Sequence, residues 1–172
     1  DKAWIQARSG SVVKVASLSN FGTWLLSTVS VADKEDQLDV GNTLNNAGKL
    51  LGANDLTLVA GTLNNSKSLA AGGTLSIAGD SLDIDNAKDA TIQANRLVLS
   101  GNRLVNKGTI QGGAAADSTL SCDTLENAVD ATLTLADEAA GGGSINVRRL
   151  DNDGTLQSYG SLTVNYSAAI DN

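Results

Sequence analysis

The side chains of this 172-residue chain that could do chemistry are arginines and carboxylates, because the sequence contains no histidine. Ser-His-Asp and Cys-His arrangements and histidine-based metal or acid–base sites are therefore excluded. One chemistry that needs no histidine is that of polysaccharide lyases, in which carboxylates hold Ca²⁺ and an arginine or lysine acts as the base. The candidates are Arg96, Arg103, Arg148 and Arg149, with Asp83, Asp85 and Asp123. These acids occur singly and do not form the cluster of roughly 6–8 oxygen ligands that Ca²⁺ prefers, so the sequence predicts a non-enzymatic protein with no metal and no cofactor.

Two other features that resemble reactive sites have a structural interpretation. Cys122 stands at a position filled elsewhere by Val, Leu or Ile, which predicts a small buried side chain rather than a reactive thiol. The glycine tracts Gly72-Gly73, Gly112-Gly113 and Gly141–Gly143 are not followed by Lys-Ser/Thr or by a helical pattern. They predict turns rather than phosphate-binding loops.

Two charged runs are the candidate partner-binding residues. They interrupt an otherwise Leu-, Asn-, Gly- and Thr-rich sequence, and each lies in a stretch longer than its equivalents. One interpretation is a solvated loop that prevents a regular edge from aggregating. The other is a recognition protrusion, and under this hypothesis the contacting residues are Asp33, Lys34, Glu35 and Asp36 in the first run and Asp137 and Glu138 in the second.

The element that must position these residues is a repeat. The stretch Leu44–Ser81 contains two consecutive 19-residue units, each opening with Leu-Asn-Asn, with aliphatic residues at the same four places. In the first unit they are Leu44, Leu50, Leu56 and Leu58, and in the second Leu63, Leu69, Leu75 and Ile77. A period of about 20 residues is typical of stacked units rather than of a conventional globular core.

The same unit extends along the whole chain and carries an asparagine column. The anchors are Leu18, Leu44, Leu63, Ile84, Leu104, Leu125, Leu150 and Ile170, and an Asn follows each by two positions: Asn20, Asn46, Asn65, Asn86, Asn106, Asn127, Asn152 and Asn172. Asn tolerates turn conformations and hydrogen-bonds to backbone, and identical Asn residues in successive layers can form a ladder. We expect the column to be structural.

Each unit contains two further strand patterns. Trp24, Leu50, Leu69, Ile92, Ile110, Leu133 and Leu156 mark the second strand. Pairs of alternating apolar residues mark the third: Val13/Val15, Leu38/Val40, Leu56/Leu58, Leu75/Ile77, Leu97/Leu99, Leu120/Cys122, Ile145/Val147 and Leu162/Val164. Such alternation is typical of a strand with one buried face. The sequence therefore predicts an all-β parallel β-helix of about seven coils, with roughly 20 residues and three short strands per coil, and a length of about 35 Å.

Three corners between the second and third strands are longer than the others. The markers are separated by 5 or 6 residues in the short units, against 14, 10 and 12 residues in the long ones. The additional residues are Ser27–Gln37, Gly112–Ser118 and Ala136–Ser144. Insertions at equivalent positions of a repeat project from one face, which is often the binding face.

Composition narrows the class of partner. The net charge of −7 disfavours nucleic acid, which is bound through Lys and Arg, and no apolar run approaches the ~20 residues of a membrane span. Proline is absent, as expected where strands pair on both edges. The chain starts and stops within units, so we expect residues 1–172 to form one β-helix segment excised from a longer array.

The units LNNAGKLLGANDLTL, LVNKGTIQGG and LDNDGTLQSYGSLTV resemble the repeats of filamentous haemagglutinin-type exoproteins of two-partner secretion. That family includes adhesins and the stalks of contact-dependent growth-inhibition exoproteins. The resemblance implies a right-handed parallel β-helix, a secreted location at the bacterial cell surface, and an outer-membrane secretion partner for the parent protein. Lys67 and Lys88 depart from the pattern, since each replaces a turn glycine.

The resemblance leads to two hypotheses of function. The first is a structural and adhesive rod that mediates or projects cell-surface contact through a protein or glycan receptor on a host or neighbouring bacterial cell. The second is the receptor-binding region of a growth-inhibition exoprotein, recognising an outer-membrane protein through the long corners. A carbohydrate-active β-helix enzyme is the third alternative.

Overall fold

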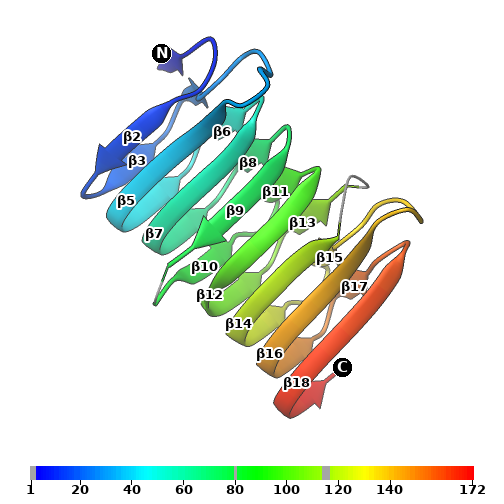
Figure 1. The fold of residues 1–172 in the computed structure, drawn as a ribbon. Coiled ribbons are helices and arrows are strands. Elements are labelled where there is room, and N and C mark those ends of the chain that lie inside the picture. Colours follow the sequence, from blue (N-terminus) through cyan, green and yellow to red (C-terminus); the bar gives the residue numbers. More distant parts are fainter. Residues whose placement is uncertain (1–2, 80, 114–116) are drawn as a thin grey trace.

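The computed structural model describes residues 3–79, 81–113 and 117–172. Within these ranges the chain forms 18 strands and no helix. The described residues therefore include no helix that is long and apolar enough to cross a membrane. Every strand pairs in parallel with the equivalent strand of the next coil, and the coils stack into a slab-like rod with the N- and C-terminal coils at opposite ends (Figure 1). The all-β stacked-coil architecture predicted from the repeat is confirmed.

The coils are built from two parallel sheets. The first, called sheet A here, has eight strands: β1 (Trp4–Gln6), β4 (Thr23–Leu25), β6 (Lys49–Gly52), β8 (Ser68–Ala71), β11 (Thr91–Ala94), β13 (Thr109–Gly112), β15 (Thr132–Thr134) and β17 (Thr155–Gln157). Sheet B contains β2 (Val12–Val15), β3 (Leu18–Asn20), β5 (Glu35–Asn46), β7 (Asp55–Asn65), β9 (Thr74–Ala78), β10 (Asp83–Asn86), β12 (Arg96–Asn106), β14 (Ser118–Asn127), β16 (Gly142–Asn152) and β18 (Ser161–Asp171). The chain alternates between the sheets, so the eight strands of sheet A correspond to eight turns in the described chain. The sequence predicted about seven because only the intervals between anchors were counted.

Two of the three strands expected per coil join in most coils. The third strand of one unit runs directly into the first strand of the next, which produces strands of 10–12 residues such as β5, β7 and β14. They remain separate only as β2/β3 and β9/β10 among the described residues. The joined strands turn a corner without losing their pairing, and the ladder is irregular between Val40 and Thr43 and between Val147 and Arg149.

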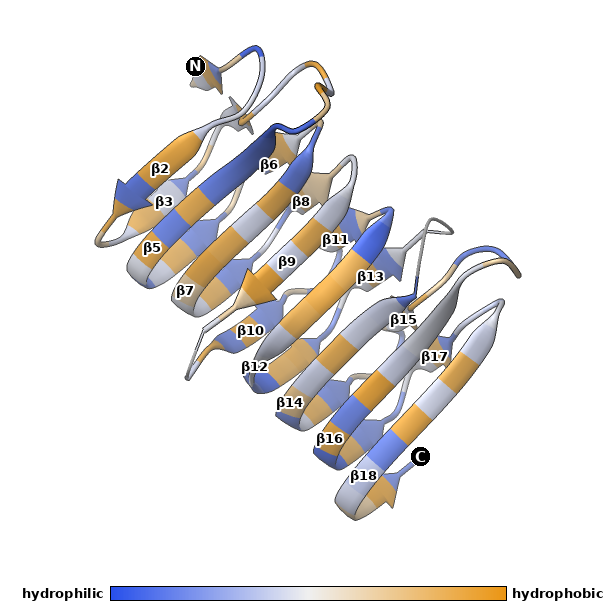
Figure 2. Cartoon of the chain, in the orientation of Figure 1, coloured by the Kyte–Doolittle hydropathy of each residue, from blue (hydrophilic) through white to orange (hydrophobic). Residues whose placement is uncertain are grey.

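The core consists of aliphatic stacks that run along the rod. The anchors pair directly, Leu44 with Leu63 and Leu104 with Leu125, and each is at most 2% exposed. In sheet A, Leu50 pairs with Leu69 in the same way. Apolar and polar residues alternate along the strands (Figure 2). Full burial of each such side chain contributes about 1.5–3 kcal/mol, and like-sized residues in successive layers leave little void.

The register differs from the prediction in three coils. The sequence aligns Leu38 with Leu56, but Leu38 pairs with Leu58, two residues further on. The same two-residue shift places Leu120 opposite Leu99 and Val164 opposite Ile145. All three shifts occur beside a long corner, because two of its additional residues extend the strand of sheet B rather than the loop. Each predicted alignment at these coils is therefore wrong by one strand repeat.

Candidate functional site: the asparagine column, the long corners and an acidic notch

The asparagines of the predicted column lie together at the corner where sheet B passes to sheet A. Each Nδ2 donates to Oδ1 of the next asparagine along the rod, at 2.6–2.9 Å, from Asn20 to Asn172. In six coils Nδ2 also donates, at 2.8–3.1 Å, to the carbonyl oxygen of the first residue of a sheet-A strand. The members from Asn20 to Asn152 are at most 9% exposed. With both amide hydrogens bound in these coils, the column has no donor left for a ligand and ties successive coils together.

The first long corner, Ser27–Gln37, is held by the coils on both sides. The backbone N–H groups of Thr28 and Val29 donate to the Arg8 carbonyl oxygen at 3.1 and 3.0 Å, and the Val31 N–H donates to Asn54 Oδ1 at 2.8 Å. The tip turns at Asp33, which has φ of 61°. Three of the predicted partner-binding residues lie exposed here: Asp33, Lys34 and Glu35.

Asp36 is not part of that exposed surface, and the expectation that the whole run projects is wrong for this residue. It lies in β5 at an inward position opposite Leu56 and is fully buried. Its Oδ1 accepts the Ser11 N–H at 2.9 Å, and its Oδ2 accepts the Ser27 hydroxyl at 2.5 Å. The physical reason is the two-residue period of the strand, which gives Asp36 the same facing as Leu38. Asp36 therefore holds the base of the corner rather than a partner.

The long corner Ala136–Ser144 likewise has a buried base and an exposed tip. Leu135 is fully buried and packs over Gly143, where a Cβ would come within 2.4 Å of the leucine Cβ. Asp137 and Glu138 are exposed, and Gln111 Nε2 donates to Asp137 Oδ2 at 3.4 Å. The two acidic side chains are thus placed on a loop whose base is fixed by packing.

The long corners Ser27–Gln37 and Ala136–Ser144 lie along one edge of the rod (Figure 1). In the corner Gly112–Ser118, residues 114–116 lie outside the described residues, while Ser118 is buried and its hydroxyl accepts the Leu97 N–H at 3.1 Å. This corner leads into β14 and the corner Ala136–Ser144 into the neighbouring β16, whereas Ser27–Gln37 leads into β5, four coil steps or about 19 Å from β14. The corners form one adjacent pair and one separate member, not a single cluster.

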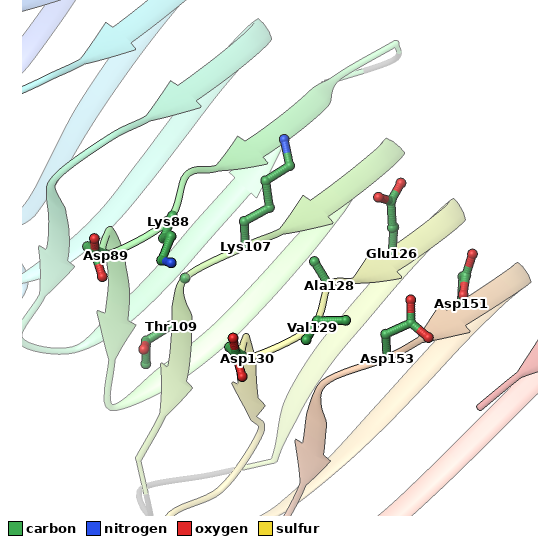
Figure 3. Close-up of a pocket in the computed structure, with 11 residues that line it drawn as sticks. Lys88, Asp89, Lys107, Thr109, Glu126, Ala128, Val129, Asp130, Asp151 and Asp153 are labelled. Atoms are coloured by element: carbon green, nitrogen blue, oxygen red, sulfur yellow. The ribbon is translucent and has the colours of Figure 1, made fainter.

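A further recess, which we call the acidic notch, lies beside the asparagine column. It has a volume of about 510 Å³. Two turns with two additional residues each, centred on Asp89 and Asp130, stand on either side of the narrow turn at Gly108, and both aspartates have positive φ, of 63° and 65°. Figure 3 shows the side chains around it: Lys88, Asp89, Lys107, Thr109, Glu126, Ala128, Val129, Asp130, Asp151 and Asp153.

The notch was missed at the level of sequence, although a signal was present. The column asparagine is followed by the next sheet-A strand after five residues at Asn86 and Asn127, and after three residues in the other coils. Five acids and two lysines line the notch, and Lys107 is paired with Asp85 at 3.4 Å. Val129 on its rim is 66% exposed. Such a recess can make polar contacts, but it contains neither a histidine nor a cysteine.

The arginines and acids considered for lyase chemistry are dispersed on the surface. Arg148 donates to both carboxylate oxygens of Asp123, at 2.7 and 3.0 Å. This bidentate contact lowers the pKa of Asp123 and raises that of Arg148. Arg103 pairs with Glu126 at 2.8 Å. Among the described residues, no three His, Cys, Asp or Glu side chains are grouped closely enough to hold a metal ion.

The remaining lyase candidates make other contacts. Arg96 Nε donates to the Asp117 carbonyl oxygen at 3.0 Å. Arg149 lies 3.8 Å from Asp151. Asp83 accepts a hydrogen bond from Asn102 at 3.0 Å. These interactions connect neighbouring coils or neighbouring residues on the surface, and they are separate contacts rather than one shared site.

Cys122 occupies a half-buried position in β14, opposite Gly101 and Val147. The pKa of its thiol is raised to about 12, chiefly by burial and also by the neighbouring Asp123 carboxylate, while a hydrogen bond with the Leu104 backbone acts in the opposite direction. The thiol is therefore protonated at neutral pH. A protonated thiol is a poor nucleophile.

Comparison with known proteins finds relatives of one kind. The chain is 35% identical over 113 residues to "Toxin CdiA" from Escherichia coli and 36% identical over 123 residues to "Deoxyribonuclease CdiA" from Dickeya dadantii (strain 3937). It is 35% identical over 111 residues to "tRNA nuclease CdiA" from Escherichia coli O6:K15:H31 (strain 536 / UPEC). The matches cover 62%, 69% and 62% of this chain, respectively. No protein-family model and no solved structure matches it.

The matched segment spans about 3% of the length of these relatives. It contains the Leu-x-Asn units that form the stacked coils, so the similarity concerns the repeat and its fold. The chain is therefore homologous to a short stretch of the CdiA contact-dependent growth-inhibition exoproteins, and its stacked coils agree with the filamentous haemagglutinin-type repeats that its sequence resembles.

Proposed function

We propose that this segment is a stiff, non-enzymatic rod that mediates or projects cell-surface contact in a secreted bacterial exoprotein. The observation that carries this proposal is the asparagine column, which is continuous from the first coil to Asn172. Each coil is also bound to its neighbours by parallel ladders in both sheets. Because every coil contacts only its neighbours, the stack lengthens without changing its cross-section.

A rod of this kind serves a parent protein that is exported by two-partner secretion. We propose a location at the bacterial cell surface and an outer-membrane secretion partner for that parent, on the strength of the CdiA relatives. The toxin and nuclease activities in the relatives' names are theirs. The segment matched here is a small fraction of each relative, and we propose that it contributes no catalysis of its own.

A second candidate function is favoured by the long corners. Asp33, Lys34 and Glu35 at one long corner and Asp137 and Glu138 at another are exposed. Both corners lie along the same edge of the rod (Figure 1). Fixed loop bases with charged tips are suited to contact with a protein or glycan receptor on a host or neighbouring bacterial cell. Under this proposal the corners recognise the receptor and the coils set their spacing.

Loop replacement separates the two functions. Residues 28–34 and 137–140 would each be replaced by a short Gly-Asn-containing turn, leaving Ser27, Asp36 and Leu135 in place because they hold the loop bases. The matched control replaces Thr57 and Asn146 on the outer face of sheet B with alanine. Binding of the labelled chain to bacterial cells is then measured by flow cytometry.

Receptor recognition by the corners predicts severalfold weaker binding for both loop replacements and unchanged binding for the control. Binding that is equal in the wild-type chain and all three variants would contradict the receptor proposal and leave the rod as the proposed function.

Lyase activity has its own test, in which the chain is incubated with a polyuronate and Ca²⁺. A rise in ultraviolet absorbance from new double bonds would contradict the non-enzymatic proposal.

A further inference from the structure

A pocket of about 220 Å³ lies beneath the first long corner. Loop residues 30–34 form one wall, and the turns of the next two coils, with Asn54, Asp55 and Gly72-Gly73, form the opposite side. Three successive coils therefore build it. It is separate from the acidic notch, with which it shares no lining residue, and it contains no member of the asparagine column.

Asn54 is the unusual member of this lining. It is 3% exposed, and its Oδ1 accepts the Val31 N–H at 2.8 Å. Its Nδ2 has no hydrogen-bond partner among the described residues. The amide cannot simply be reversed, because the Val31 N–H requires an oxygen opposite it. Buried polar groups are almost always paired with protein or water, so a buried donor beside a pocket has a place for an acceptor from outside the chain, either a water or a ligand oxygen.

The other polar groups of the pocket define the chemistry of that acceptor. Asp33 is exposed, and Asp55 uses Oδ1 to accept the Thr74 N–H at 2.6 Å, which leaves its second oxygen available. Lys34 has no ion pair within the described part of the chain. The lining thus offers the donors of Asn54 and Lys34, the two carboxylate acceptors, and the Ser30 hydroxyl, which can both donate and accept.

This combination disfavours a charged ligand. An anion would meet two carboxylates, and a cation would meet the Lys34 ammonium and the Asn54 amide. A neutral ring with several hydroxyls satisfies both kinds of group, because each hydroxyl donates and accepts. The pocket is smaller than the roughly 300–1,000 Å³ of drug-sized sites, which fits a single ring rather than an extended ligand.

We propose that this corner pocket binds one neutral hexopyranose ring. Asn54 Nδ2 and Lys34 Nζ donate to hydroxyl oxygens of the ring, and Asp33 and Asp55 accept from its hydroxyls. Because Nδ2 has almost no surface open to water, residues 30–34 must shift slightly to admit the ring. No described lining residue is aromatic, so the contacts are polar and the dissociation constant is on the order of 1 mM.

The proposal deepens the surface-contact function and rests on it, since it names the ligand class of one corner. It is tested with the intact ¹⁵N-labelled chain by two-dimensional NMR titration. The probes are methyl α-D-glucopyranoside and methyl β-D-galactopyranoside, with glucuronate and glucosamine as charged comparisons. We expect the Asn54 side-chain amide and the Lys34 and Gly73 backbone amides to shift with at least one neutral glycoside, and to shift less with both charged sugars.

Two variants and a control complete the test. Asn54→Asp keeps the oxygen that accepts the Val31 N–H and removes the free donor, and Lys34→Met removes an exposed donor without touching the loop base. Both are expected to weaken binding about tenfold, whereas Lys107→Met at the acidic notch is expected to leave it unchanged. If Asn54→Asp does not fold, Lys34→Met alone decides.

Absence of shifts at these amides with both neutral glycosides overturns the proposal, as does equal binding by the wild-type chain and Lys34→Met. In either case the unpaired donor of Asn54 is met by water. The titration uses free glycosides, whereas the loop-replacement experiment measures binding to whole cells. A negative titration therefore overturns the sugar site but leaves the proposed surface-contact function to be tested by the cell-binding experiment.

Discussion

Replacing Asn106 with alanine in the middle of the asparagine column should destabilise the stack strongly. Asn106 is fully buried. Its Nδ2 donates to Asn127 Oδ1 and to the Thr132 carbonyl oxygen, both at 2.9 Å. Its Oδ1 accepts from Asn86 Nδ2 at 2.8 Å and from the Gly108 N–H at 3.3 Å. Alanine removes all four hydrogen bonds at once.

The magnitude follows from these four contacts. A typical hydrogen bond contributes about 0.5–1.5 kcal/mol net, and an orphaned buried group costs about 1–3 kcal/mol. Some of the orphaned groups retain a second partner, as Asn86 Nδ2 does with the Thr109 carbonyl oxygen at 3.1 Å. We therefore expect the free energy of unfolding to fall by about 3–5 kcal/mol, a large part of the roughly 5–15 kcal/mol of a typical domain.

The matched control is Asn64→Ala. Asn64 makes one side-chain hydrogen bond, from its Nδ2 to Asn45 Oδ1 at 2.8 Å, on the exposed face. Its removal should cost less than about 1 kcal/mol. Urea denaturation followed by far-ultraviolet circular dichroism gives both values, and hydrogen exchange shows whether the coils flanking Asn106 open first. Losses that agree within about 0.5 kcal/mol for the two variants would refute the structural role of the column.

Three further predictions concern single positions. Asp36→Ala should lower the free energy of unfolding by about 3 kcal/mol, because it leaves the proton of the buried Ser27 hydroxyl and the Ser11 backbone N–H without an acceptor. Chemical denaturation measures this, and a loss below about 1 kcal/mol would contradict it. Cys122 should resist alkylation at pH 8 in the native state and react in urea, and rapid alkylation of the native protein would contradict its burial. Because burial is the main cause that raises its pKa from 9.0 to about 12, only the unfolded thiol ionises between these pH values, so the free energy of unfolding should fall as the pH rises through that interval. Gly108→Ala should be strongly destabilising because its Cβ would lie 2.4 Å from a backbone oxygen, whereas Gly41→Ala, whose nearest neighbour would be 3.8 Å away, should be tolerated; equal melting temperatures for the two variants would contradict the close packing of the turn.

The stacked fold could be predicted from sequence because a repeat states the same information in every coil. Leu44 and Leu63 occupy equivalent places in their units, and the structure pairs them directly. The asparagine column follows from the same phase, since each member from Asn20 to Asn152 ends a strand of sheet B. The local sequence pattern and the pairing with neighbouring coils agree in such an array, so the strand positions in one unit predict those in the others.

The register beside the long corners could not be predicted, for a physical reason. A shift of two residues preserves which side chains face inward, so the alternating pattern is the same in either register. Leu38 is inward whether it pairs with Leu56 or with Leu58. The burial of Asp36 could not be predicted either, because a charged residue does not indicate that a strand with an inward face has already begun. Only the pairing itself shows that it is buried.

The pockets depended on information that a single unit does not contain. The acidic notch arises because turns of different length stand side by side in successive coils, at Asp89, Gly108 and Asp130. The corner pocket requires the loop at Lys34 to overhang the two following turns. Both are properties of neighbouring coils, and a comparison of turn lengths along the rod would have indicated only the first.

The central claim is that the chain is a stack of separable coils, and deletion of one whole coil tests it most directly. Removing residues 87–106 joins Asn86 to Lys107 and keeps the phase of the column, whereas removing residues 87–96 takes out β11 and breaks that phase. Urea denaturation monitored by circular dichroism compares the two. We predict a cooperative transition of native-like steepness for the whole-coil deletion and none for the half-coil deletion. Loss of folding in both would contradict the account.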